Sequence, residues 1–394
     1  MKKFKNTKKW ISLALAGATC FSLISCGGKG GEREYVPHDW SQGPIILDNV
    51  TQAKNVILLI GDGMGPNQIK AGEIFKGEEL VMQKFPYSTK VETRSADSAV
   101  TDSAAAGTAL ATGTRTNNGC IGKHPNGFNL RTIVDYAHDL GKRTGVITTE
   151  ELTGATPMAF AAHATNRGST FEIVESASDV KSNVNLYLSY TLSASYTYYF
   201  ENTGYKIIDE VDDISKSKKD KILGSYLINA HAPSMNDELD FASFDRLVWE
   251  ALEYLSKDED GFFLMAEGAH IDHGGHNNDM VYMLDELLAF DLGVKAALEW
   301  AKERNDTVVI VTADHETGGL QLDEGLTQEM LKADYDAGGF ICEGYEWTTT
   351  GHSATDVCCF INGADIDFSK YSFGRDDRIQ NVDIFKIMKE LMGA

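Results

Sequence analysis

The chain has 394 residues, of which 42% are hydrophobic, and its formal net charge is −22 at pH 7. This length and apolar content suffice for a large core, in one domain or two, and they exclude a disordered or fibrous protein. The negative charge argues against a nucleic-acid partner, because the protein would repel a polyanionic backbone.

The N-terminus has the features of a bacterial export signal. Five lysines within residues 2–9 precede an apolar stretch at residues 11–24, which is too short to span a bilayer comfortably. The stretch runs into Leu-Ile-Ser-Cys-Gly, which resembles a lipobox, the motif whose cysteine becomes the lipidated first residue of the mature protein. An ordinary secretory signal or an uncleaved anchor is the alternative.

We therefore predict a lipoprotein signal peptide at residues 1–25 and a tether at residues 26–45. The mature protein would be exported and anchored to a membrane through the lipidated Cys26, in the periplasm or at the cell surface. Removal of the signal peptide takes away five lysines and no acidic residue, so the mature chain is more acidic still.

Residues 46–394 alternate between strand and helix patterns, taken in chain order. Strands are predicted at residues 55–60, 89–93, 144–148, 261–266, 307–311 and 356–361, and helices at 103–111, 130–140, from 156 onward, 244–255, 280–301 and 382–392. Such alternation is typical of an α/β fold, here a three-layer αβα sandwich around a mostly parallel central sheet. Residues 169–240, rich in Ser, Tyr and Lys, break the pattern, and we predict a peripheral insertion there.

Acidic residues and histidines follow three of the predicted strands. Asp62 comes after the first strand, Asp314 and His315 come after the strand at 307–311, and residues 267–276 hold two carboxylates and three histidines. Carboxylates and imidazoles are the ligands of divalent metal ions, and ligands of α/β folds gather at the carboxyl ends of strands. The sequence therefore predicts a hydrolase with several metal ions.

Three further residues are candidates for the chemistry. Ser103 opens an Ala-rich helix, where free backbone N–H groups suit a phosphorylated serine or a phosphate; a simple N-cap is the alternative. Arg167 has the planar group that can bind two oxygens of a tetrahedral anion, although taken alone a surface salt bridge is the favoured explanation. His352 gains weight because the other clusters need one more nitrogen.

Six motifs then occur together along the chain. They are Gly61-Asp62-Gly63-Met64-Gly65, Val100-Thr101-Asp102-Ser103-Ala104-Ala105, Ala155-Thr156-Pro157, Glu267-Gly268-Ala269, Ile271-Asp272 and Thr312-Ala313-Asp314-His315. In these motifs, and in their order, the chain resembles the alkaline phosphatase family, the two-zinc, one-magnesium phosphomonoesterases, as a bacterial lipoprotein member. The resemblance covers most of the predicted mature chain.

The resemblance implies a role for each matching residue. Ser103 would be the nucleophile that takes the phosphoryl group, and Arg167 would hold the non-bridging phosphate oxygens. One zinc ion would be held next to Ser103 by Asp62, Asp314 and His315, the other by Asp272, His276 and His352, and the magnesium ion by Asp62, Thr156 and Glu267. Mixed nitrogen and oxygen ligands suit zinc, whereas an all-oxygen set suits magnesium.

Two positions depart from the family pattern. Gly154 stands two residues before Thr156, where family members often have Asp or His. His273, next to Asp272, stands where many bacterial relatives have Lys and animal relatives have His. We predict that His273 contacts the substrate phosphate through water. The tyrosine-rich stretch within residues 169–240 takes the place of a Gly-rich segment that many relatives carry.

The prediction from sequence is thus an exported phosphomonoesterase that releases inorganic phosphate from varied organic monoesters. The alternatives are a phosphodiesterase or another hydrolase of the same superfamily, and a non-catalytic phosphate-binding or metal-binding lipoprotein. Ser103 and Arg167 favour monoesters, and a complete ligand set favours an enzyme over a binding protein. The resemblance also suggests a homodimer, which no segment of the sequence indicates by itself.

Overall fold

The computed structural model describes residues 43–228, 241–339, 341, 343–372 and 378–394. The predicted signal peptide, Cys26 and most of the predicted tether lie outside these residues, as does the end of the predicted insertion. The division of the chain at residues 25 and 45 therefore stays a prediction.

An eleven-stranded sheet organises the described residues, in the order β15-β2-β14-β9-β1-β8-β3-β4-β6-β5 with β7 paired to β6. Its strands are β1 (Asn55–Gly61), β2 (Tyr87–Glu92), β3 (Arg143–Glu151), β4 (Leu186–Tyr190), β5 (Lys206–Ile208), β6 (Ile222–Ile228), β7 (Phe241–Ala242), β8 (Phe262–Gly268), β9 (Thr307–Thr312), β14 (Val357–Asn362) and β15 (Arg378–Gln380). The pairs are parallel except those of β14 with β2 and β9. The prediction of an α/β fold around a mostly parallel sheet is confirmed.

The strands at the centre of the sheet carry no polar face. Every residue of β1, β8 and β9 is buried. Continuous apolar runs of this kind are typical of parallel strands that helices cover on both sides. The same runs made these strands recognisable in the sequence.

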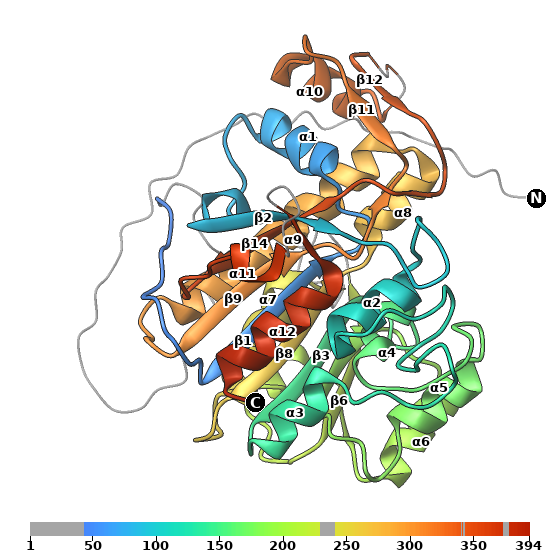
Figure 1. The fold of residues 1–394 in the computed structure, drawn as a ribbon, viewed down its shortest axis with the longest axis vertical. Coiled ribbons are helices and arrows are strands. Elements are labelled where there is room, and N and C mark those ends of the chain that lie inside the picture. Colours follow the sequence, from blue (N-terminus) through green and yellow to red (C-terminus); the bar gives the residue numbers. More distant parts are fainter. Residues whose placement is uncertain (1–42, 229–240, 340, 342, 373–377) are drawn as a thin grey trace, which may run out of the picture. The chain divides into compact units, whose positions relative to one another are not determined.

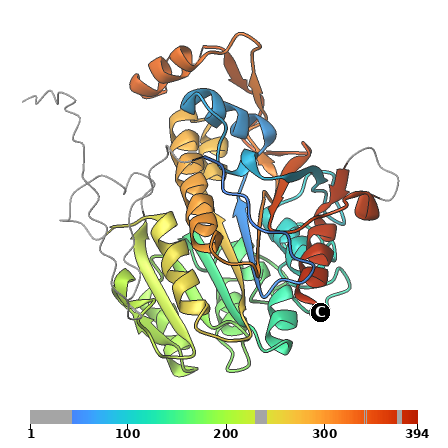
Figure 2. The same cartoon turned by 90° about the vertical axis from the view of Figure 1, so that its left-hand side faces the viewer.

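Helices cover the sheet on both faces (Figures 1 and 2). The helices α7 (Phe244–Leu255) and α9 (Met280–Ala301) lie on one face, and α2 (Ser103–Thr112), α3 (Ile133–Asp139) and α12 (Asn381–Met392) lie on the other. The remaining helices are α1 (Pro66–Lys76), α4 (Ala155–Ala159), α5 (Thr170–Ala177), α6 (Ala194–Asn202), α8 (His270–Asn277), α10 (Gln328–Asp336) and α11 (Ser369–Ser372), with short 3₁₀ turns at Met82–Lys84 and Val211–Asp213.

A glycine lets α2 and α4 pack closely. A Cβ added at Gly107 would lie 3.0 Å from Ala159 Cβ and 3.3 Å from Thr156 Cα. Any larger residue would push the two helices apart. The packing matters for the site because Ser103 is on α2 and Thr156 is on α4.

The predicted insertion is continuous with the central sheet over its described part. Its strands β4, β6 and β5 extend the sheet beyond β3 and form one edge of it. Tyr187 of β4 is fully buried, and its ring packs against those of Phe200 and Tyr205. These aromatic residues therefore stabilise the sheet edge.

Several elements were not predicted. They include α1, α8, α10, α11, β15 and two small two-stranded sheets, formed by β10 (Glu316–Thr317) with β13 (His352–Ser353) and by β11 (Leu320–Leu322) with β12 (Tyr345–Trp347). In Figure 1, α10, β11 and β12 lie together beyond α1, which contacts both α10 and β11. Among the described residues, no helix combines the length and the apolar character that crossing a bilayer requires.

Candidate active site

The carboxyl ends of neighbouring parallel strands bring acidic residues together. In the ladder, Ile60 of β1 pairs with Glu267 of β8 on one side and with Thr312 of β9 on the other. Asp62 follows directly after β1 and Asp314 is the second residue after β9, so both lie at the same edge of the sheet as Glu267. All three carboxylates are buried.

The antiparallel strand β14 explains how His352 reaches this edge. Because β14 runs against β9, its N-terminal end lies beside the C-terminal end of β9. The preceding strand, β13, pairs with β10, so that His352 lies opposite Thr317. A histidine from late in the chain thus joins residues that follow β9.

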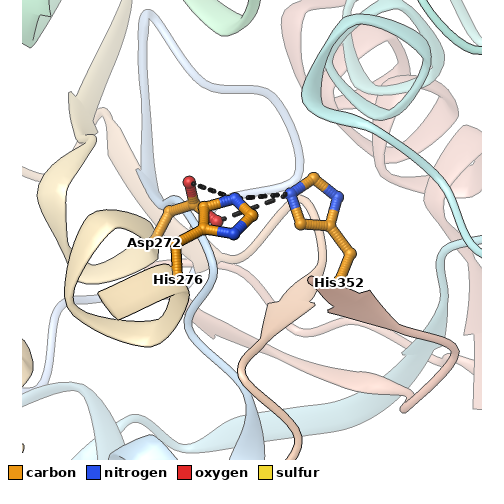
Figure 3. A group of neighbouring side chains, drawn as sticks. All are labelled: Asp272, His276 and His352. Atoms are coloured by element: carbon orange, nitrogen blue, oxygen red, sulfur yellow. Dashed lines mark hydrogen bonds and ion pairs between the residues drawn. The ribbon is translucent and has the colours of Figure 1, made fainter. Parts of the chain in front are cut away.

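The first cluster consists of Asp272, His276 and His352 (Figure 3). Asp272 and His276 are four residues apart on α8, and therefore lie on one face of that helix. His276 Nε2 lies 3.3 Å from Asp272 Oδ2 and 3.2 Å from His352 Nε2, and His352 Nε2 lies 3.6 Å from Asp272 Oδ1. The three donor atoms converge on one point, as ligands of a metal ion do.

The other ring nitrogens of this cluster are held by the backbone. His276 Nδ1 lies 2.6 Å from the carbonyl oxygen of Thr350, and His352 Nδ1 lies 2.9 Å from that of Thr101. Metal-binding histidines usually donate their second N–H group in this way, which fixes the ring and leaves Nε2 free as a ligand.

The second cluster surrounds His315. His315 Nε2 lies 3.2 Å from Asp314 Oδ2 and 3.5 Å from Asp62 Oδ1, and the side chain is fully buried. Asp272 approaches it as well, since Asp62, Asp272 and His315 form a group that could hold a metal ion. The two clusters therefore share Asp272 and lie side by side.

The predicted oxygen ligands form a third group. Thr156 Oγ1 lies 3.5 Å from Asp62 Oδ2, and Thr148 donates a hydrogen bond of 2.5 Å to Glu267 Oε2. Within the described part of the chain, Asp62 Oδ1, Glu267 Oε1 and Asp314 Oδ2 are buried and accept no hydrogen bond. Buried carboxylate oxygens without donors are costly unless a cation neutralises them, so the residues fit bound metal ions.

The acid–base properties of these residues lead to the same conclusion. Burial, and then the charges of neighbouring carboxylates, raise the pKa values of Asp62 and Glu267 well above their usual range. Burial and the charge of Asp272 raise the pKa of Asp314 to about 7. A hydrogen bond to Asp272 raises the pKa of His276 to about 9. Without a cation, protons would have to take the place of the missing positive charge.

Ser103 stands beside the second cluster with its hydroxyl available. The N-cap of α2 is Asp102, whose carboxylate accepts a hydrogen bond of 3.0 Å from the backbone N–H of Ala105. Ser103 is the first residue of the helix proper, and its Oγ lies 3.1 Å from His315 Nε2. The alternative that Ser103 is a simple N-cap is therefore wrong. Asp102, not Ser103, accepts the hydrogen bond from a free backbone N–H group at the start of the helix.

Arg167 also approaches Ser103 with its guanidinium group. Its guanidinium lies 3.3 Å from Asp102 Oδ2 and 3.5 Å from Ser103 Oγ, and its side chain is 42% exposed. Burial opposes its charge, but the carboxylates of Asp102 and Asp62 outweigh burial and raise the pKa of Arg167. The salt bridge foreseen as an alternative exists, and it orients the arginine toward the serine.

His273 lies on α8 between the two ligands of the first cluster, and it is exposed. Its ring stacks on that of His270, with 4.7 Å between the centroids. Its predicted contact with phosphate through water stays a prediction.

Two residues of the site were not singled out from the sequence. Thr317 donates a hydrogen bond of 2.5 Å to Asp272 Oδ1 and lies 3.2 Å from His315 Nδ1, so it links both clusters. Asp102 both caps α2 and holds Arg167. The aspartate before the serine was a detectable N-cap signal, whereas no local pattern marks Thr317.

A pair of substitutions separates the two roles of Asp102. Asn is as good an N-cap as Asp, whereas Ala cannot cap. We expect Asp102→Ala to lower the free energy of unfolding by about 1 kcal/mol and Asp102→Asn to lower it much less. Urea denaturation measures both, and equal losses in the two variants would contradict the capping role.

The architecture and the converging ligands define a class: a hydrolase that binds metal ions. A family model described as alkaline phosphatase matches residues 53–197 and 191–346. Alkaline phosphatase 3 of Bacillus subtilis is 32% identical over 345 residues, 82% of this chain and 71% of that protein. Alkaline phosphatase 4 of the same bacterium is 33% identical over 297 residues, 69% of this chain and 63% of that protein.

The same family appears among solved structures. The alkaline phosphatase from the Antarctic bacterium TAB5 superimposes with a TM-score of 0.72 at 29% identity, covering 88% of this chain and 99% of that one. A variant of that enzyme was solved with Mg bound in its M3 site. This chain belongs to the alkaline phosphatase family, and its general activity is the hydrolysis of phosphate monoesters.

Proposed function

We propose that this protein hydrolyses varied organic phosphate monoesters through a phosphoserine intermediate at Ser103 and releases inorganic phosphate. One observation carries the proposal: Ser103 Oγ lies between His315 Nε2 at 3.1 Å and the Arg167 guanidinium at 3.5 Å. A nucleophile between a metal-binding cluster and a fixed cation is the arrangement that transfer of a dianionic phosphoryl group needs.

We propose two zinc ions and one magnesium ion as the cofactors. Asp272, His276 and His352 suit one zinc ion, and Asp62, Asp314, His315 and Ser103 suit the other, while the oxygen donors Asp62, Thr156 and Glu267 suit magnesium. When bound, such ions lower the pKa of the serine hydroxyl and offset the charge that develops on the attacking and leaving oxygens.

The chain's own residues position the substrate. The planar guanidinium of Arg167, oriented by Asp102, donates to two non-bridging phosphate oxygens. Ser103 loses its hydroxyl proton, and its Oγ forms a bond to phosphorus while the bond between phosphorus and the alcohol oxygen breaks; the departing oxygen takes up a proton, and the alcohol leaves. Water cleaves the phosphoserine in the second step and regenerates the hydroxyl. Ser103 is the first residue of α2, so the capped helix fixes the position from which its Oγ attacks phosphorus.

The predicted export signal is the basis for the location that we propose. The lysines of residues 2–9, the apolar stretch and the lipobox-like sequence support a lipoprotein anchored through Cys26, in the periplasm or at the cell surface. We also propose a homodimer, and the resemblance to the family is the only support for it.

Hydrolysis of an aryl phosphate at pH 9, with and without a chelator, tests the proposed function. We expect turnover that the chelator abolishes and that zinc plus magnesium restore. An aryl diester measured in parallel addresses the phosphodiesterase alternative, and faster turnover of the diester would overturn the preference for monoesters. Turnover that the chelator does not affect would rule out the metal mechanism.

The His273 prediction has its own measurement. A contact with phosphate through water is worth about as much as one hydrogen bond, so we expect His273→Ala to weaken inhibition by phosphate roughly twofold to tenfold. His138→Ala, an exposed histidine on α3, is the matched control. Unchanged affinity for substrate and phosphate in His273→Ala would contradict the prediction.

A further inference from the structure

The side chain of Glu150 fills the space next to Gly154. Glu150 stands near the end of β3, and Gly154 precedes α4, the helix that carries Thr156. A Cβ added at Gly154 would clash with Glu150 Oε1 and lie 2.5 Å from its Cδ. Gly154 has φ −54° and ψ 154°, which other residues adopt as well, so its backbone does not require glycine. The missing side chain instead makes room for the Glu150 carboxylate.

The backbone of Glu150 is linked to the predicted magnesium ligands. Its N–H group donates a hydrogen bond of 3.1 Å to Thr148 Oγ1, and the hydroxyl of Thr148 donates one of 2.5 Å to Glu267 Oε2. On the other side, Gly154 leads into α4 and Thr156, whose hydroxyl faces Asp62. Glu150 is therefore connected to Glu267 through Thr148, and its side chain lies next to Gly154, two residues before Thr156.

The charge of Glu150 acts on the same residues. Burial is the main cause of the raised pKa values of Asp62 and Glu267, and the Glu150 carboxylate raises both further. Burial likewise raises the pKa of Glu150 to about 7, although His270 and Arg167 act in the opposite direction. Among the described residues, no hydrogen bond or ion pair reaches the Glu150 carboxylate. A buried acid that repels neighbouring carboxylates and accepts no hydrogen bond from the described residues is stabilised by a cation between those carboxylates.

We propose that Glu150 supplies a carboxylate to the magnesium position formed by Asp62, Thr156 and Glu267, in place of the side chain that Gly154 lacks. The inference rests on the proposed function, because it assumes that this position binds magnesium. Magnesium usually keeps several waters and takes only one or two carboxylates directly, so Glu150 acts on the ion directly or through one of its waters. In either case its charge increases the affinity for Mg²⁺.

Magnesium binding to the protein tests the proposal without reference to turnover. Protein stripped with a chelator and reloaded with zinc is titrated with Mg²⁺ by calorimetry. We expect Glu150→Gln, which keeps the shape and removes the charge, to weaken Mg²⁺ binding about 10-fold to 100-fold. Glu151→Gln, the adjacent and exposed glutamate, is the matched control and should bind as the unmodified protein does. Equal affinity in all three proteins would overturn the proposal, as would no Mg²⁺ binding to the unmodified protein.

A reciprocal exchange provides the second test. Gly154→Asp in the unmodified protein places two side chains in one space, so we expect weaker Mg²⁺ binding and a lower melting temperature. In a Glu150→Ala background the space is empty, and Gly154→Asp should restore most of the Mg²⁺ affinity that Glu150→Ala removes. If the second substitution restored nothing, Glu150 would not occupy the place of a residue 154 side chain.

The two proposals fail in different ways. If the protein turns over aryl phosphate but Glu150→Gln binds Mg²⁺ normally, only the role of Glu150 is wrong. If Glu150→Gln loses Mg²⁺ affinity in a protein that hydrolyses no monoester, the role of Glu150 stands and the proposed function is wrong.

Discussion

Ser103→Ala is expected to lower kcat for aryl phosphate by about 10³-fold or more, because it removes the atom that we propose as the acceptor of the phosphoryl group. The substitution deletes one oxygen beside His315 and leaves every carboxylate and imidazole of the clusters in place. The content of zinc and magnesium per chain should therefore stay that of the unmodified protein. Steady-state kinetics and metal analysis on the same preparation measure both quantities.

The chain contains a matched control for this substitution. Ser98 also follows an aspartate and precedes an alanine, but its hydroxyl accepts a hydrogen bond from the Val100 N–H and belongs to a turn. We expect Ser98→Ala to change kcat by less than about tenfold, which is the scale of one hydrogen bond. If Ser103→Ala kept normal turnover, the phosphoserine mechanism would be refuted.

Removal of the metal ions is expected to have the second large effect, on stability as well as on turnover. A ligand present at 1,000 times its dissociation constant stabilises the folded state by about 4 kcal/mol. With more than one such site, we expect a chelator to lower the melting temperature by roughly 10 °C or more. Differential scanning calorimetry before and after chelation measures the change, and re-addition of zinc and magnesium should reverse it.

The pH dependence of the chelated protein follows from its buried acids. The pKa values of Asp62, Glu267 and Asp314 are raised in the folded state, that of Asp314 to about 7. Below pH about 4 these carboxyl groups are mostly protonated in both the folded and the unfolded protein. As the pH rises toward 7, the unfolded chain releases protons that the folded chain retains. The free energy of unfolding therefore falls. Burial lowers the pKa of His315, so this group makes the folded state more stable as the pH rises. It is a single group against three acids.

We therefore expect the melting temperature of the chelated protein to fall between pH 5 and pH 7, and the effect of the chelator to be larger at pH 7. Asp272→Asn, which weakens both clusters, should reduce the difference that the chelator makes. A melting temperature that neither chelator nor Asp272→Asn changes would contradict bound metal ions as part of the fold.

Most long elements could be predicted because their patterns are local. The helix α9 was predicted with its observed ends, and β1, β8 and β9 were recognised from their apolar runs. The helix α8 was missed because Gly274 and Gly275 and three histidines give it low intrinsic helix propensity. In the fold those glycines permit close packing: a Cβ would lie 2.6 Å from Met283 Cα at Gly274 and 2.7 Å from the Thr317 carbonyl at Gly275. Tertiary contacts thus stabilise a helix that its sequence does not favour.

The sequence by itself determined the family, the α/β class and the residue types that bind metal ions, since each is carried by a short motif or a local period. Only the tertiary structure decided that Ser103 lies against His315, 212 residues away, that Asp102 rather than Ser103 caps α2, and that Glu150 occupies the space beside Gly154. These contacts depend on strand order and on packing between segments distant in the chain, and neither leaves a periodic signal in the residues concerned.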